Sequence, residues 1–279
     1  MKPIILLLAF LIMPSVSMAE DKTLKEKSKE ITEKVKEDIK EVLPTAEKEE
    51  RKDMFNLTSY DPVYFIYSER STKVQASFKY KLLRDYNLYG GYTHLILWDL
   101  NGESRPFLDV NYNPELFYRW DFKGEGFLES IDAIAYGHLS NGKELGESRS
   151  MDYTAGRFNF KTKLKKNRVL RTSLKVRIMG NFDQENEELR KYYGPFELKF
   201  TLTEFLTGVI DKGEITGRFY TGGNFGEDFS KGGQEIGLSF RIYGLEITPA
   251  FYIQYFHGYS EALRFFDQKE NIIRFGLLL

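Results

Sequence analysis

The chain has 279 residues, of which 42% are hydrophobic and 29% charged, and its 40 Lys and Arg residues nearly balance its 41 Asp and Glu residues. This balance excludes bulk electrostatic attraction to nucleic acid, and the lack of cysteine excludes a disulfide framework and a cysteine metal site. No apolar run beyond the N-terminus is long enough for a membrane-spanning helix. The aromatic content of 15% is unusual.

The first 19 residues have the three parts of an export signal. Lys2 supplies positive charge, residues 4–13 form an apolar core, and Ser17-Met18-Ala19 is a small-x-small cleavage site. This apolar core is too short for a membrane anchor. We therefore expect residues 1–19 to be a signal peptide, and export combined with the lack of cysteine suits a bacterial envelope protein.

Residues 20–53 form a separate segment that is dominated by Lys and Glu. A narrow apolar stripe at roughly helical spacing, which ends at Pro44, predicts a solvated helix or a flexible leader. The alternative is a coiled-coil arm that binds a partner, but the narrowness of the stripe disfavours it. The expected organisation is a charged periplasmic leader at 20–53, followed by a barrel domain at 54–279.

After Met54 the hydrophobic period changes from that of a helix to strict alternation. Residues 74–82, for example, place Val, Ala, Phe, Tyr and Leu on one face and Gln, Ser and Lys on the other. Turns rich in Gly, Asn and Asp join such segments without room for a helical crossover, so neighbouring strands should be antiparallel. Twelve strands are predicted, near 61–68, 73–83, 88–100, 112–122, 126–140, 150–164, 168–180, 194–205, 208–222, 232–244, 245–260 and 271–279.

Two architectures could use these strands. A soluble sandwich or barrel would bury the apolar faces inside, whereas a transmembrane barrel would turn them to lipid. Many of the segments are longer than the five or six residues usual in soluble proteins, and their even number, the export signal and the aromatic residues near their ends fit a membrane barrel. We therefore predict an all-β fold, a 12-stranded antiparallel transmembrane barrel in the bacterial outer membrane, although the terminal Leu277-Leu278-Leu279 lacks the aromatic residue common there.

Three polar residues are expected on the lipid-facing side of this barrel. His138 and Ser140 share a strand face, predicted to be that of Ile134 and Tyr136, and Asp152 lies on the apolar face of the next strand. Polar groups that face lipid need partners, so we expect Ser140 to bond His138 and His138 to bond Asp152. These are the roles of a nucleophile, a general base and the group that orients the base. The alternative is that all three belong to a polar girdle near the headgroups.

The remaining histidines, His94 and His257, have no nucleophile in an obvious catalytic arrangement and are interpreted as barrel or girdle side chains. The run His138-x-Ser140-Asn141-Gly142, followed by Ser148-Arg149-Ser150-x-Asp152, resembles the active-site region of the outer membrane phospholipase A family. Further motifs of that family are similar to Arg105-Pro106-Phe107, Asn111-Tyr112-Asn113-Pro114-Glu115-Leu116-Phe117, Lys191-Tyr192-Tyr193-Gly194, Gly233-Gln234-Glu235-Ile236-Gly237-Leu238-Ser239 and Gln254-Tyr255-Phe256-x-Gly258-Tyr259-x-Glu261-x-Leu263. The resemblance spans residues 60–279 and leaves out the charged leader.

The resemblance implies a twelve-stranded barrel that hydrolyses phospholipid acyl esters as a phospholipase A1 or A2, with lysophospholipase activity as a further alternative. It assigns Ser140 as the nucleophile, His138 as the base and the backbone N–H of Gly142 to the oxyanion. Asp152 takes the third position of the triad, where the familiar member of the family has Asn. An aspartate stabilises an imidazolium more strongly but costs more to desolvate, so activity remains plausible.

The resemblance also implies a calcium ion beside the serine. Its ligands would be the carbonyl of Lys143 and the hydroxyl of Ser148, with the carbonyl of Arg105 contributed across a reversible homodimer. Membrane phospholipids are then the expected substrate, and no nucleic acid partner is expected. The rival hypothesis is a passive outer-membrane pore, or a structural barrel whose site does not function.

Overall fold

The computed structural model describes residues 57–124, 126–165, 167–180, 186–204, 211–241 and 249–279, so the predicted signal peptide and leader lie outside the described residues. Within these ranges nearly all regular structure is β-strand. No helix in the described ranges has the length and apolar character needed to cross a membrane. The elements are β1 (Thr58–Ser59), β2 (Tyr64–Tyr67), β3 (Thr72–Lys81), β4 (Leu88–Trp98), β5 (Phe107–Asp121), β6 (Leu128–Ser140), η2 (Leu145–Glu147), β7 (Ser150–Lys163), β8 (Val169–Met179), η3 (Glu187–Lys191), β9 (Phe196–Leu202), β10 (Asp211–Gly222), β11 (Asp228–Arg241), β12 (Ala250–Gly258), η4 (Leu263–Phe265) and β13 (Glu270–Leu278).

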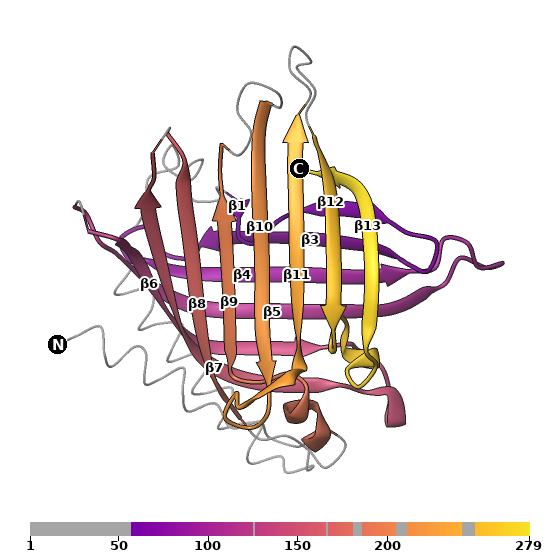
Figure 1. The fold of residues 1–279 in the computed structure, drawn as a ribbon. Helices are drawn as coiled ribbons and strands as arrows, with labels where there is room; N and C mark the ends of the chain where they lie inside the picture. The colour runs from indigo at the N-terminus through magenta and orange to yellow at the C-terminus, as the bar shows by residue number, and fades with distance from the viewer. Residues whose placement is uncertain (1–56, 125, 166, 181–185, 205–210, 242–248) are drawn as a thin grey trace, which may run out of the picture. The chain divides into compact units, whose positions relative to one another are not determined.

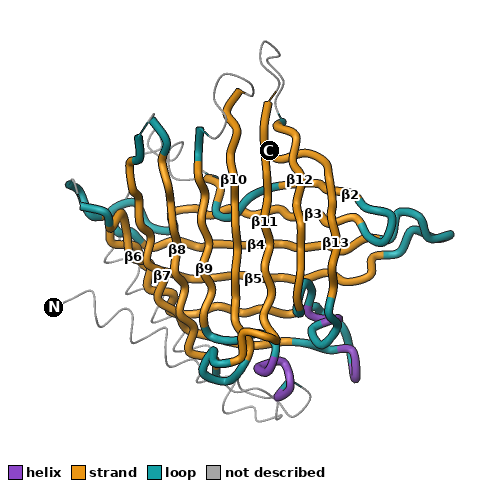
Figure 2. The backbone as a smooth tube through the Cα atoms, viewed as in Figure 1, coloured by secondary structure: helices purple, strands orange, loops and turns teal. Residues whose placement is uncertain are grey.

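Strands β2 to β13 form a closed antiparallel barrel. Each strand pairs with the next along the chain, and β13 returns to pair with β2, which closes the ring of twelve. The two-residue β1 pairs only with β3. Figure 1 shows β4 and β5 crossing behind the front strands at a steep angle, and Figure 2 follows the same backbone as a continuous wall. The predicted 12-stranded antiparallel barrel is confirmed, and each of the twelve predicted segments overlaps one of these strands.

The two faces of the wall differ in chemistry as the alternation predicts. On β8, Lys175 and Arg177 are buried inside the barrel, whereas the next residue, Ile178, is 74% exposed. Arg177 pairs with Glu197 of β9 at 2.8 Å inside the barrel. The polar faces therefore satisfy one another in the lumen, and the apolar faces form the outer wall that lipid would cover.

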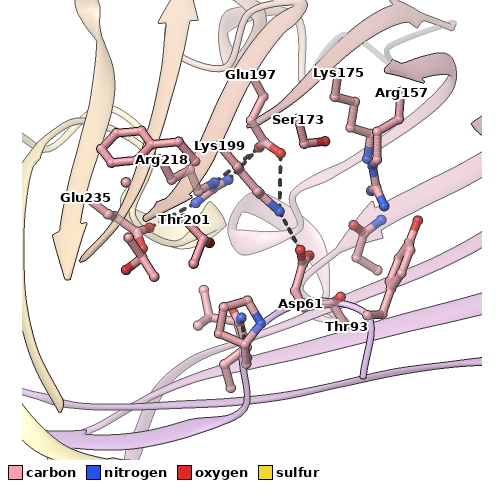
Figure 3. Close-up of a pocket in the computed structure, with 18 of the residues that line it drawn as sticks. Asp61, Thr93, Arg157, Ser173, Lys175, Glu197, Lys199, Thr201, Arg218 and Glu235 are labelled. Carbon is pink, nitrogen blue, oxygen red and sulfur yellow. Dashed lines mark hydrogen bonds and ion pairs between the residues drawn. The ribbon is translucent and has the colours of Figure 1, made fainter. Parts of the chain in front are cut away.

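Charged pairs occupy much of the lumen, which encloses a cavity of about 610 Å³. Lys199 lies between Asp61 at 2.7 Å and Glu197 at 3.4 Å, and Asp61 belongs to the segment just before β2. Arg218 bridges Glu197 at 2.9 Å and Glu235 at 3.0 Å (Figure 3). The Lys199–Asp61 contact crosses the lumen and the Arg218 contacts join neighbouring strands, so the interior resembles a packed polar core more than an open channel.

A β-bulge interrupts β6 just before the predicted site. Ile134 pairs with Phe117 of β5, but Tyr136 pairs with the adjacent Leu116, so Ala135 has no partner on β5. The same shift occurs against β7, between Ile134 and Gly137. An inserted residue reverses which face the following side chains occupy.

The bulge corrects one sequence expectation. Ile134 was expected to share the outward face of His138, but it is 2% exposed and packs inside the barrel against Phe117 and Tyr153. Tyr136, which follows the bulge, is 50% exposed on the outer wall. The predicted outward orientation is therefore correct for Tyr136, which follows the bulge, and wrong for Ile134, which precedes it.

Candidate active site

The hairpin of β6 and β7 brings His138 and Asp152 together on the outer wall. The two residues are register partners, and His138 Nδ1 lies 2.7 Å from Asp152 Oδ1. Their side chains are 33% and 53% exposed, so the pair lies at the protein surface. When Nδ1–H donates to the carboxylate, Nε2 is left as the acceptor that a general base needs.

Ser140 lies two residues beyond His138 on the same strand and pairs in register with Ser150 of β7 and Tyr112 of β5. Among the described residues, the Ser140 hydroxyl has no recorded hydrogen bond, so the expected bond to His138 is not formed in this structure. Contacts between a nucleophile and its base are often loose without substrate and tighten in the reacting complex. The structure thus brings two of the three predicted residues into contact and places the third on the same strand, two residues away.

Tyr136 completes the polar group and was not predicted from the sequence. Its hydroxyl donates to Asp152 Oδ1 at 3.0 Å, the same oxygen that contacts His138 Nδ1 at 2.7 Å. The available signal was its spacing of two residues from His138. That spacing indicates a shared face, but it does not show that the phenol reaches across to β7.

The turn after Ser140 is organised by the side chain of Asn141, which is 2% exposed. Its Oδ1 accepts from the backbone N–H of Arg149 at 2.9 Å, and its Nδ2 donates to the carbonyl of Glu147 at 2.9 Å. The two backbones are also joined, because the N–H of Asn141 donates to the carbonyl of Arg149 at 3.0 Å. One buried amide therefore fixes the shape of the loop from 141 to 149.

Gly142 begins this loop in the left-handed region, with φ of +60°. A Cβ at this position would lie 3.1 Å from the ring of Tyr112, so both backbone conformation and space favour glycine. Among the described residues, its N–H has no recorded acceptor. The amide is therefore free to donate to a substrate oxygen beside Ser140.

The predicted calcium ligands lie on loops at the barrel end where β4 and β6 finish. Lys143 and Ser148 belong to the loop fixed by Asn141, whereas Arg105 lies between β4 and β5 and adopts φ of +45°. The Arg105 carbonyl accepts from the indole Nε1 of Trp98 at 2.8 Å, which leaves one lone pair free. Within the described ranges, no group of three or more His, Cys, Asp and Glu residues could hold a metal ion. Neutral carbonyl and hydroxyl oxygens remain, and they are the hard ligands that calcium accepts.

The lumen anchors the hairpin of β6 and β7 from its inner side. Asn113 Nδ2 donates to the carbonyl of His138 at 2.9 Å and to the hydroxyl of Tyr153 at 2.8 Å. Tyr153 in turn donates to Glu115 at 2.7 Å, and Glu115 also binds Lys175. This buried network holds the backbone on both sides of the His138–Asp152 pair.

Neither of the other two histidines joins the site. His94 Nδ1 contacts the hydroxyl of Tyr92 at 2.8 Å and its ring meets that of Tyr112 edge-on at 5.0 Å. His257 stacks on Tyr255 with ring centres 6.4 Å apart. Both histidines are side chains of the barrel wall, in agreement with the interpretation of the sequence.

Comparisons with known proteins match the chain to phospholipase A1 proteins. It is 28% identical over 206 residues to phospholipase A1 of Proteus vulgaris, covering 71% of this chain and 64% of that protein's length. It is 26% identical over 261 residues to phospholipase A1 of Escherichia coli K12, covering 83% of this chain and 84% of that one.

Solved structures agree with this fold. Outer membrane phospholipase A from Escherichia coli superposes with a TM-score of 0.66 at 24% identity, over 83% of this chain and 94% of that one. The outer membrane phospholipase of Salmonella typhi, solved as a dimer with bound calcium, gives 0.65 at 25% identity, over 81% and 92%. The family model of phospholipase A1 matches residues 67–279, and the chain therefore belongs to the phospholipase A1 family.

Proposed function

We propose that the chain hydrolyses phospholipid acyl esters in the bacterial outer membrane, with Ser140, His138 and Asp152 as its triad. The observation that carries the proposal is the 2.7 Å contact between His138 and Asp152, beside a serine on the outer wall of a closed barrel. Membership of the phospholipase A1 family supports the same reaction. A site on the outer wall lets lipid reach it by lateral diffusion within the membrane, without entering the lumen.

The chemical step follows from this arrangement. The Ser140 hydroxyl attacks the acyl carbonyl while His138 Nε2 takes its proton and passes it to the departing alcohol oxygen. Asp152 holds the imidazole through Nδ1 and stabilises its protonated form. The Gly142 N–H donates to the oxyanion, and water activated by the same histidine then hydrolyses the acyl-enzyme.

The proposal includes calcium dependence, because the available oxygens fit that ion. The carbonyl of Lys143 and the hydroxyl of Ser148 would hold it beside the oxyanion position. When bound, calcium supplies positive charge close to the developing oxyanion. The solved Salmonella typhi relative is described as a dimer with bound calcium, which supports the same ion here.

Two ligands from one chain leave a calcium site incomplete, since calcium takes six to eight oxygens. We propose that the carbonyl of Arg105 from a second copy contributes to it in a reversible homodimer. The acyl chain would then lie along the interface between two outer walls. Residues 1–19 and 20–53 remain a proposed signal peptide and periplasmic leader, ahead of the barrel domain at 54–279.

The rival proposal, a passive pore, has less support. The lumen carries ion pairs between parts of the wall that are not neighbours, including Lys199 with Asp61 at 2.7 Å and Lys73 with Glu235 at 3.2 Å. A barrel with a decayed site would not need the His138–Asp152 contact or a glycine held against Tyr112. These features favour the hydrolase.

The decisive experiment measures phospholipid hydrolysis by the full chain in detergent, with and without a calcium chelator. Hydrolysis that requires calcium, disappears in Ser140→Ala and persists in Ser150→Ala supports the proposal. Ser150 is the matched control because it is the register partner of Ser140 and carries no assigned role. Full hydrolysis by Ser140→Ala, or ion conductance without any hydrolysis, would overturn it.

A further inference from the structure

The hydroxyl of Tyr136 makes a second contact with the carboxylate that orients the histidine. Tyr136 Oη lies 3.0 Å from Asp152 Oδ1, and His138 Nδ1 lies 2.7 Å from the same atom. One carboxylate oxygen therefore accepts from two donors on β6. No other hydrogen bond of Tyr136 or of the Asp152 carboxylate is recorded among the described residues.

The bulge at Ala135 is what makes this contact possible. Before the bulge the even-numbered residues of β6 point inward, as the burial of Ile134 shows. After it, Tyr136 and His138 both point outward and lie on either side of Gly137, whose register partner is Tyr153. Both outward side chains then reach Asp152, the residue that precedes Tyr153 on β7.

We propose that Tyr136 is a positioning residue that fixes the Asp152 carboxylate for His138; the inference rests on the proposed triad. Asp152 is 53% exposed, so packing alone does not fix its rotamer. The phenol gives Oδ1 a second donor besides the imidazole and so keeps the carboxylate in place to orient Nδ1. Tyr136 does not touch the reacting atoms and acts only through Asp152.

The charge of Asp152 gives this contact its strength. Hydrogen bonds to an ionised acceptor are roughly twice as strong as neutral ones, and a carboxylate has no donor of its own. A carboxylate facing the lipid side of the wall also needs its lone pairs satisfied. Tyr136 therefore suits aspartate at this position better than it would suit a neutral asparagine.

The test is a double-mutant cycle on kcat for phospholipid hydrolysis by the full chain in detergent. Tyr136→Phe removes only the hydroxyl and should lower kcat about 10-fold with KM nearly unchanged, a loss close to the lower end of the range expected for a hydrogen bond to a charged group. The same change in an Asp152→Ala background should lower kcat less than about twofold, because the acceptor oxygen is already gone. In an Asp152→Asn background the loss should lie between these values.

Tyr118→Phe is the matched control, because Tyr118 is on the outer side of β5, packs against Trp120 and has no recorded hydroxyl contact among the described residues. It should retain wild-type kcat. An equal fold loss for Tyr136→Phe in the wild-type and Asp152→Ala backgrounds would show a packing role and overturn the inference. So would wild-type kcat in Tyr136→Phe alongside an inactive Ser140→Ala, a result that leaves the proposed triad intact. Full activity of Ser140→Ala would instead overturn the triad, and this inference with it.

Discussion

Replacing Asn141 with alanine should disable the loop that carries Gly142 and Ser148 while leaving the barrel folded. The Asn141 side chain is 2% exposed and makes two hydrogen bonds of 2.9 Å, to the N–H of Arg149 and the carbonyl of Glu147. Both bonds lie within the loop between β6 and β7. The main effect is therefore expected in the loop beside Ser140.

The size of the effect follows from the bonds that are lost. Each contributes about 0.5–1.5 kcal/mol, and partly buried backbone groups left without a partner add to that. A total of about 2–3 kcal/mol is expected, and each 1.36 kcal/mol is tenfold in rate. If the whole loss falls on the competent loop conformation, kcat should fall about 30- to 150-fold.

The assay is kcat for phospholipid hydrolysis in detergent, with circular dichroism and thermal unfolding to show that the barrel is intact. Asn141→Asp is the matched variant, because it keeps the acceptor for Arg149 but places an oxygen against the Glu147 carbonyl. Its kcat should lie between those of the wild type and the alanine variant. A kcat for Asn141→Ala within threefold of the wild type would refute the claim that this side chain sets the loop.

Three further changes test the surroundings of the site. Gly137→Val should lower stability by about 1–3 kcal/mol and reduce activity, because a Cβ there would lie 2.4 Å from the buried Tyr153 ring; an unchanged unfolding midpoint would contradict this. Glu115→Ala should destabilise the barrel by about 3–5 kcal/mol in urea titrations, since it leaves Lys175 buried without its partner, whereas Glu115→Gln should cost less. Asp152→Asn should retain substantial hydrolysis and Asp152→Ala should lose most of it, and equal rates in the wild type and both variants would remove Asp152 from the proposed triad.

The sequence alone determined the architecture of the barrel. In a strand, successive side chains point to opposite faces, so the alternation of apolar and polar residues is a local record of strand position and of which face is which. For that reason each of the twelve predicted segments overlaps a strand, and polar side chains such as Lys175 and Glu197 lie inside the barrel as expected. The pairing of His138 with Asp152 could also be anticipated, because both lie near the turn of one hairpin.

Only the tertiary structure decided the details of the site. A bulge leaves no mark in the alternation, since Ala135 becomes an extra residue only relative to the hydrogen-bond ladders of β5 and β7. That single residue turned Ile134 inward and brought Tyr136 onto the outer wall. The roles of Tyr136 and Asn141 depend on partners 16 and 8 residues away, across a hairpin and a loop. Alternation is a property of one strand, whereas register and side-chain contacts are properties of several strands together, which is why the sequence specified the wall and the fold specified the site.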